Sequence, residues 1–162
     1  MNTRLSQLTE KSRQLTGIFE QRRSLLATTP SIWPVRGYLS DGFGNRTDPF
    51  TGQRDFHPGL DISAPLGTKV QAPADGTVVF VGVKGGYGNA ITVDHGRGIM
   101  THYGHLDAFN VRVGQAVRRG SIIGFVGSTG RSTAPHLHYE VWLNGSNQNP
   151  LQYILDEYRS LG

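Results

Sequence analysis

The chain has 162 residues, a formal net charge of +4, 22 glycines and no cysteine. This length allows one domain with its own hydrophobic core but not two full domains. The lack of cysteine excludes disulfides and thiolate metal sites. A basic chain favours an anionic partner, but no run of Lys or Arg and no basic-aromatic patch is present, so we expect no nucleic-acid partner.

Hydropathy argues against a membrane segment. No apolar run approaches the ~20 residues that a spanning helix needs, so we expect no membrane span in this chain. The polar N-terminus lacks the apolar core of a signal peptide, so no export signal or membrane anchor is expected within it either. Two locations stay open: the cytoplasm, or the cell envelope if the targeting region belongs to a longer protein.

Residues 1–27 differ in composition from the rest of the chain, with a single glycine, no proline and many good helix formers. They predict an N-terminal α-helix. Steps of three and four place apolar residues at five of seven positions of one seam, namely Leu5, Leu8, Leu15, Phe19 and Leu26. Two interpretations follow: a helix packed on its own domain, or the end of a longer coiled coil with a helical partner for residues 1–27.

Residues 28–34 contain two prolines and predict a linker, followed by a β-rich domain over 35–162. Short β-branched runs separated by Gly, Asn or Pro are typical of antiparallel sheet. The residues after Pro150 predict a short closing helix. The fold class is therefore mainly β, an antiparallel sheet domain after an N-terminal helix. The expected strands are 60–63, 76–83, 90–95, 98–105, 111–113, 121–126 and 136–143.

The stretch "PHLHYEV" places two histidines in one expected strand. Because side chains alternate faces along a strand, His136, His138, Glu140 and Trp142 share one face, and the apolar residues between them share the other. The two histidines then lie about 7 Å apart at Cα, from two rises of ~3.4 Å. Both histidines can reach one small site, although two half-exposed histidines on a solvent-facing side of the sheet would give the same pattern.

The stretch "HPGLD" places His57 and Asp61 in a loop that runs into a short strand. A histidine and a carboxylate suit zinc, which takes N and O ligands at ~2.0–2.2 Å. An aspartate at the start of an apolar strand also serves as a turn cap, so this stretch alone does not separate the two roles.

The stretch "THYGHLD" carries two more histidines. In a regular strand His105 shares a face with Thr101 and Tyr103, and His102 lies on the opposite face. His95, in "DHGRG", is expected to cap a hairpin. Four of the six histidines and one aspartate therefore lie in three short segments that can converge. Three protein ligands and a water form the usual catalytic zinc arrangement, with the remaining histidines free for acid, base or oxyanion roles.

The ordered set H-x-x-x-D, Y-x-H and H-x-H, with its glycine pattern, resembles the lysostaphin-type (LytM-type) zinc metallopeptidases over about residues 33–153. The resemblance implies an antiparallel β fold with a substrate groove and one Zn²⁺ per chain. It implies that His57, Asp61 and His138 are the metal ligands, and that His105 and His136 are catalytic residues that do not bind the metal.

The function that the resemblance implies is zinc-dependent hydrolysis of peptide bonds in bacterial peptidoglycan, in the periplasm or outside the cell. Two other interpretations stay open. The fold also serves as a non-catalytic cell-wall binding or activator module, and a small-molecule metal enzyme or sugar-binding barrel would use both H-x-H histidines as ligands. The sequence does not identify the bond cleaved.

Overall fold

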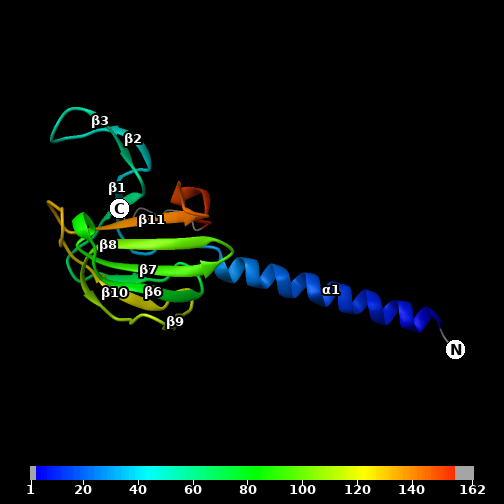
Figure 1. Cartoon of the computed structure of the whole chain (residues 1–162). Helices are drawn as coiled ribbons and strands as arrows, with labels where there is room; N and C mark the ends of the chain where they lie inside the picture. The colour runs from blue at the N-terminus through cyan, green and yellow to red at the C-terminus, as the bar shows by residue number, and fades with distance from the viewer. Residues whose placement is uncertain (1–2, 156–162) are drawn as a thin grey trace.

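The computed structural model describes residues 3–155, and its largest part is an antiparallel β domain from which one long helix projects (Figure 1). All strand pairings are antiparallel, which confirms the predicted mainly β class. No helix within residues 3–155 is both long and apolar enough to cross a bilayer.

Helix α1 (Thr3–Thr28) confirms the predicted N-terminal helix, and none of its described residues is buried. The side chains of Leu8, Leu15 and Phe19 on the predicted seam are more than half exposed. In Figure 1 the helix points away from the sheet along its whole length. The described structure therefore does not show the helix packed along its own domain.

Within residues 3–155, the region that the structure describes, α1 bonds the β domain through its C-terminal end. The Arg97 guanidinium donates to the Leu25 carbonyl and to the Thr28 hydroxyl, and the Arg119 guanidinium donates to the Leu26 carbonyl. Two cations at the C-terminus of a helix satisfy its free carbonyls and complement the negative end of its dipole. The segment that follows is also packed, with Pro30, Ser31 and Pro34 buried.

The central sheet runs in the order β1-β4-β11-β8-β7-β6-β9, while β10 joins β8 to β5, and β12 pairs with β11. A separate two-stranded hairpin is formed by β2 and β3. The strands are β1 (Tyr38–Asp41), β2 (Gly44–Thr47), β3 (Arg54–His57), β4 (Leu60–Ser63), β5 (Lys69–Gln71), β6 (Gly76–Val83), β7 (Asn89–Gly96), β8 (Ile99–Phe109), β9 (Ala116–Val117), β10 (Ile122–Val126), β11 (His136–Leu143) and β12 (Ser146–Gln148).

Six of the seven expected strands are present, with bounds shifted by a few residues in some. The strand expected at 111–113 is wrong, since these residues form a loop instead. There the amide of Gln115 donates to the Arg112 carbonyl, and the Arg112 amide donates to the Gln115 side chain. This turn removes the backbone groups that a sheet ladder would need.

The core lies on the face of the sheet predicted from alternation in β11. Leu137, Tyr139 and Val141 are fully buried, beside Leu60 and Ile62 of β4. The opposite face of β11 carries His138 and Glu140, which are also buried but against polar partners. The sheet thus separates an apolar core from a polar layer that holds His138 and Glu140.

Gly59 allows β4 to lie close to β11. A Cβ at this position would be 2.2 Å from the Tyr139 carbonyl oxygen and 2.8 Å from Cγ of Glu140. No real Cβ contact is that short, so a larger residue would force the two strands apart. The glycine of "HPGLD" is therefore required by a close approach of backbones.

Two expectations need correction. His95 does not cap a hairpin: it is buried, and its ring nitrogens contact the Asp75 carbonyl and the Thr101 hydroxyl, both at 2.8 Å. The predicted closing helix is present only as a 3₁₀ turn, η2 (Pro150–Gln152), capped by the Asn149 side chain. The remainder of that predicted helix, from residue 156 on, lies outside the described residues.

Candidate metal and catalytic centre

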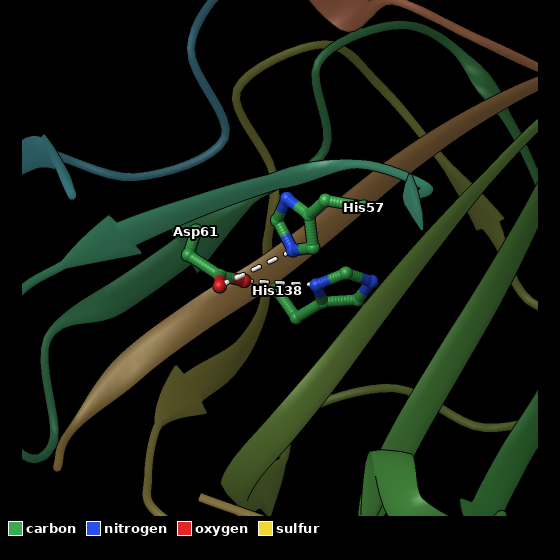
Figure 2. Close-up of side chains that lie close together, drawn as sticks. All are labelled: His57, Asp61 and His138. Carbon is green, nitrogen blue, oxygen red and sulfur yellow. Dashed lines mark hydrogen bonds and ion pairs between the residues drawn. The ribbon is translucent and has the colours of Figure 1, made fainter. Parts of the chain in front are cut away.

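Three strands bring His57, Asp61 and His138 together (Figure 2). His57 ends β3, and Asp61 follows it by four residues across the Pro58–Gly59 turn into β4. His138 lies in β11, directly opposite Asp61 in the antiparallel register. Because a directly opposed pair on one sheet face brings its Cβ atoms to about 4.5–5.5 Å, the pairing of β4 with β11 sets the distance between carboxylate and imidazole.

The donor atoms of the three side chains converge. Nε2 of His57 lies 3.2 Å from one Asp61 oxygen, and Nδ1 of His138 lies 2.8 Å from the other. The three ligand atoms lie within 4.8 Å of one another. Two imidazole nitrogens and one carboxylate oxygen at this spacing can hold a metal ion, and the combination suits zinc better than Ca²⁺ or Mg²⁺, which prefer oxygen ligands.

The second nitrogen of each imidazole in this triad is occupied by an outer partner. Nδ1 of His57 lies 2.9 Å from the Gly42 carbonyl, and Nε2 of His138 lies 2.6 Å from a Glu140 oxygen. Since a carbonyl only accepts, the proton of neutral His57 is on Nδ1, and its Nε2 lone pair faces Asp61. This arrangement of outer partners is common for metal-binding histidines.

The electrostatics of the triad follow from these contacts. Burial raises the pKa of Asp61, but hydrogen bonds from His138 and His57 outweigh burial and bring its pKa well below the usual range. Burial lowers the pKa of His138, while its bonds to Asp61 and Glu140 outweigh that effect and raise the pKa to about 9. The Asp61 carboxylate is therefore ionised at neutral pH. In the metal-free site the His138 ring is then protonated on both nitrogens and carries a positive charge.

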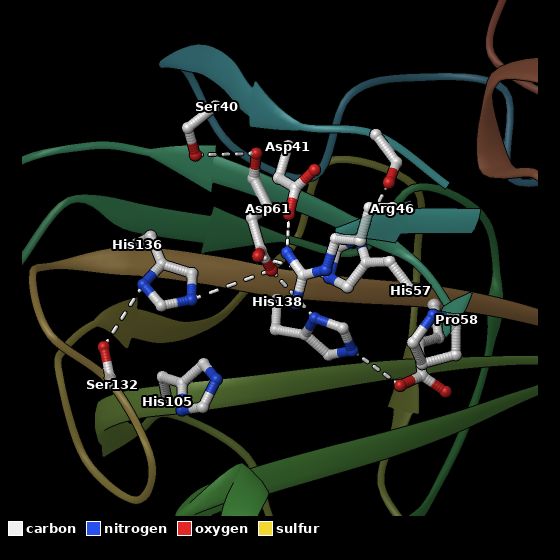
Figure 3. A network of polar contacts seen from close by, with 12 residues as sticks. Ser40, Asp41, Arg46, His57, Pro58, Asp61, His105, Ser132, His136 and His138 are labelled. Atoms are coloured by element: carbon white, nitrogen blue, oxygen red, sulfur yellow. Dashed lines mark hydrogen bonds and ion pairs between the residues drawn. The ribbon is translucent and has the colours of Figure 1, made fainter. Parts of the chain in front are cut away.

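His105 and His136 lie together beside the triad (Figure 3), with ring centroids 4.6 Å apart. Nε2 of His136 is 3.7 Å from an Asp61 oxygen, and the His105 ring is 6.0 Å from the His138 ring. Nδ1 of His105 bonds the Thr129 carbonyl at 2.7 Å, and Nδ1 of His136 bonds the Ala134 carbonyl at 2.8 Å. All five predicted residues therefore meet in one place.

The structure corrects the predicted face of His105. Thr101 and Tyr103 are buried and bonded to each other, and Leu106 is in the core. The pairing of β7 with β8 shifts between Tyr103 and Leu106, and His105 has φ of +61°. This bulge inserts one extra residue and reverses the alternation.

As a result His105 lies on the polar face with His102 and not opposite to it. His102 contacts the Trp142 ring at 5.4 Å between centroids and the Thr92 hydroxyl at 2.8 Å. The Tyr-Gly-His order was a usable signal, because a glycine inside a strand often marks a bulge.

Burial sets the charge of His105. The loss of water around its ring lowers the pKa of His105, and the neighbouring His136 and His138 add to that decrease when they are protonated. His105 is therefore neutral at pH 7. With its proton held on Nδ1 by the Thr129 carbonyl, its Nε2 is left as a proton acceptor.

Several groups around the centre were not predicted as part of it. The Tyr87 ring lies 5.5 Å from the His138 ring, and Arg46 forms an ion pair with Asp41 close to the triad (Figure 3). Glu140 was placed on the right face but given no role. Tyr87, Arg46 and Asp41 lie outside the three histidine motifs, so no sequence pattern connected them to the site.

A family profile and two relatives of known name match most of the β domain. The profile of Peptidase family M23 matches residues 55–150. The DD-carboxypeptidase/endopeptidase Mpg of Neisseria meningitidis is 51% identical over 117 residues, which are 72% of this chain and 27% of that protein. The peptidoglycan DD-endopeptidase ShyC of Vibrio cholerae is 40% identical over 116 residues, with the same two coverages. The chain thus spans about a quarter of these relatives' length.

Among solved structures, a zinc-containing peptidase from Vibrio cholerae superposes with a TM-score of 0.71 at 35% identity, covering 76% of this chain and 39% of that one. The fold, the converging His-Asp-His triad and the profile match over more than half of the residues agree with one another and with the predicted lysostaphin-type resemblance. The chain belongs to peptidase family M23.

Proposed function

We propose that this chain is a zinc-dependent endopeptidase that hydrolyses peptide bonds in bacterial peptidoglycan. The observation that carries the proposal is the convergence of His57, Asp61 and His138 with two further histidines beside them. The zinc-containing peptidase of similar fold supports the metal, and ShyC, a peptidoglycan DD-endopeptidase, supports the substrate. Peptidoglycan lies outside the cytoplasmic membrane, so the proposal includes a periplasmic or extracellular location.

The proposed ligands of one Zn²⁺ are His57 through Nε2, His138 through Nδ1 and a carboxylate oxygen of Asp61. The outer hydrogen bond of each ring leaves that nitrogen facing Asp61, and Nδ1 of His138 becomes a ligand once it has lost its proton. When bound in such a three-ligand site, zinc acts as a Lewis acid and lowers the pKa of a coordinated water toward ~7.

The proposed catalytic residues are His105 and His136. Each ring has Nδ1 bound to a backbone carbonyl, so each neutral ring presents Nε2 as a proton acceptor. A histidine that has taken a proton from the attacking water becomes a donor, able to protonate the leaving amine or to stabilise an oxyanion. The two fixed carbonyls keep both rings in place through this exchange.

We also propose that residues 1–27 are a separate element, connected by residues 28–34 to a peptidase domain over 35–162. The described part of α1 buries no residue, and its exposed apolar seam suits a helical partner. Among the described residues, its backbone carbonyls bond the domain at Leu25, Leu26 and Ala27, in the last turn.

Digestion of purified peptidoglycan tests the activity. We expect new peptide products by mass spectrometry, their loss after incubation with a chelator, and their return on addition of zinc. Full cleavage in excess chelator at equilibrium would exclude the metal. Binding to peptidoglycan with no cleavage by the zinc-loaded protein would favour the non-catalytic module.

Histidine variants test the assignment of roles. His138→Ala should bring bound zinc well below one per chain, whereas His105→Ala should keep the metal and reduce the cleavage rate by roughly 10²- to 10⁴-fold, as for a lost general acid or base. His136→Ala should behave like His105→Ala. Elemental analysis beside a cleavage rate measures both quantities.

A matched control for these variants is His102→Ala, which removes a histidine of the same polar face that contacts Thr92 and Trp142. Its metal content and rate should stay near those of the parent. Zinc loss in His136→Ala with zinc retained in His138→Ala would reverse the assignment along β11.

Metal uptake should depend on pH. Because the pKa of His138 is raised to about 9 in the metal-free site, its proton must leave before Nδ1 can bind zinc at neutral pH. Each unit of pH below 9 should therefore weaken apparent zinc affinity by about tenfold, the ratio expected for one competing proton. Competition with a chelator of known proton affinity between pH 7 and 9 measures this slope, and a flat profile would contradict it.

Removal of residues 1–27 tests the domain division. The shortened protein should stay folded and bind one zinc per chain, because no motif residue and no buried residue of α1 is lost. Its melting temperature should fall slightly, since the bonds to the Leu26 and Ala27 carbonyls disappear. A molten or insoluble product would show that α1 belongs to the folding unit.

A further inference from the structure

Glu140 is a buried acid that the proposed mechanism does not use. It is 1% exposed and lies two residues after His138 on the same face of β11. One of its oxygens bonds Nε2 of His138 at 2.6 Å. The other accepts from the Trp142 indole at 2.7 Å and from the Asn147 side-chain amide at 3.1 Å.

Such an acid is costly to bury, and its surroundings show that it is held in one orientation. An ionised carboxylate away from water is unfavourable unless charge and hydrogen bonds compensate for lost hydration. The donors to the Trp142-facing oxygen come from β11 and β12, so they fix the far side of the carboxylate. Its other oxygen faces Nε2 of His138, and the carboxylate also accepts a hydrogen bond from the Tyr87 hydroxyl.

The position of Glu140 separates it from the reacting groups. It contacts Nε2 of His138, whereas Asp61 contacts Nδ1 on the other side of the same ring. His105 and His136 lie on the Asp61 side of that ring (Figure 3). A carboxylate behind the ring can therefore act on the centre only through His138.

We propose that Glu140 is a positioning residue, which accepts the Nε2 proton of His138 and so presents the Nδ1 lone pair to the metal. This inference rests on the proposed metal site. Trp142 of β11 and Asn147 of β12 hold the carboxylate in turn. The contacts therefore run from these two strands through Glu140 to the His138 ring. Outer partners of this kind typically contribute 10- to 100-fold to metal affinity.

Glu140→Gln is the informative variant because it keeps the shape of the side chain. If its carbonyl oxygen accepts from Trp142 and Asn147, its amide faces Nε2 of His138 as a donor. His138 must then carry its proton on Nδ1, the tautomer that cannot bind a metal there. We expect zinc affinity to fall by about 10- to 100-fold. The ring ¹⁵N shifts of His138 in the metal-free protein, recorded above pH 9 where the parent ring is neutral, should report the changed tautomer.

The matched control is Val141→Ala, which removes a buried core side chain on the same strand without touching Glu140 or His138. It should melt at a lower temperature yet bind zinc like the parent. Trp142→Phe, which removes one donor to Glu140 and keeps the carboxylate, should weaken zinc binding less than Glu140→Gln does. Glu140→Ala, measured beside them, should weaken it at least as much as Glu140→Gln.

Zinc affinity by chelator competition and the ¹⁵N shifts are measured without any substrate, so they are independent of peptidase activity. Parent-like affinity and tautomer in Glu140→Gln would overturn the positioning role while leaving the proposed function intact. A parent protein that does not bind zinc would overturn both. Tight zinc binding that depends on Glu140, with no cleavage of peptidoglycan, would support the positioning role and contradict the proposed peptidase function.

Discussion

The centre depends on the antiparallel pairing of β4 with β11. That pairing sets Asp61 opposite His138, and Gly59 permits it because a side chain there would collide with the β11 backbone. His57 reaches the same carboxylate from the end of β3 across a four-residue step. A slip of one residue would turn either Asp61 or His138 into the apolar core, so the packing of Leu137 and Tyr139 also protects the geometry of the polar groups.

A second constraint is the use of fixed acceptors behind the rings. Gly42, Thr129 and Ala134 each present a backbone carbonyl to Nδ1 of one histidine, while Glu140 takes Nε2 of His138. Because a carbonyl can only accept, each of the three carbonyl contacts selects one tautomer of the neutral ring without a titratable partner. The loops that carry Gly42, Thr129 and Ala134 therefore orient the histidine rings through their backbone carbonyls.

Sequence patterns predicted the β class, the helix and three segments that can converge, and the resemblance to lysostaphin-type peptidases selected the five side chains within them. His105 reached the site for a reason other than the one predicted. Its strand contains a bulge, and the positive φ at that residue turns the ring to the polar face. The role of Glu140 could not be inferred, because its significance depends on Asn147, which pairing with β12 brings alongside.

The docking of α1 has a geometric consequence. Arg97 occupies the turn between β7 and β8, whereas His105 lies several residues further along β8. The helix is thus fastened to the end of this hairpin that is remote from His105. At about 1.5 Å per residue, the 26 residues of this helix extend over roughly 39 Å. A force applied along the helix would be transmitted to the turn that carries Arg97 and to Arg119.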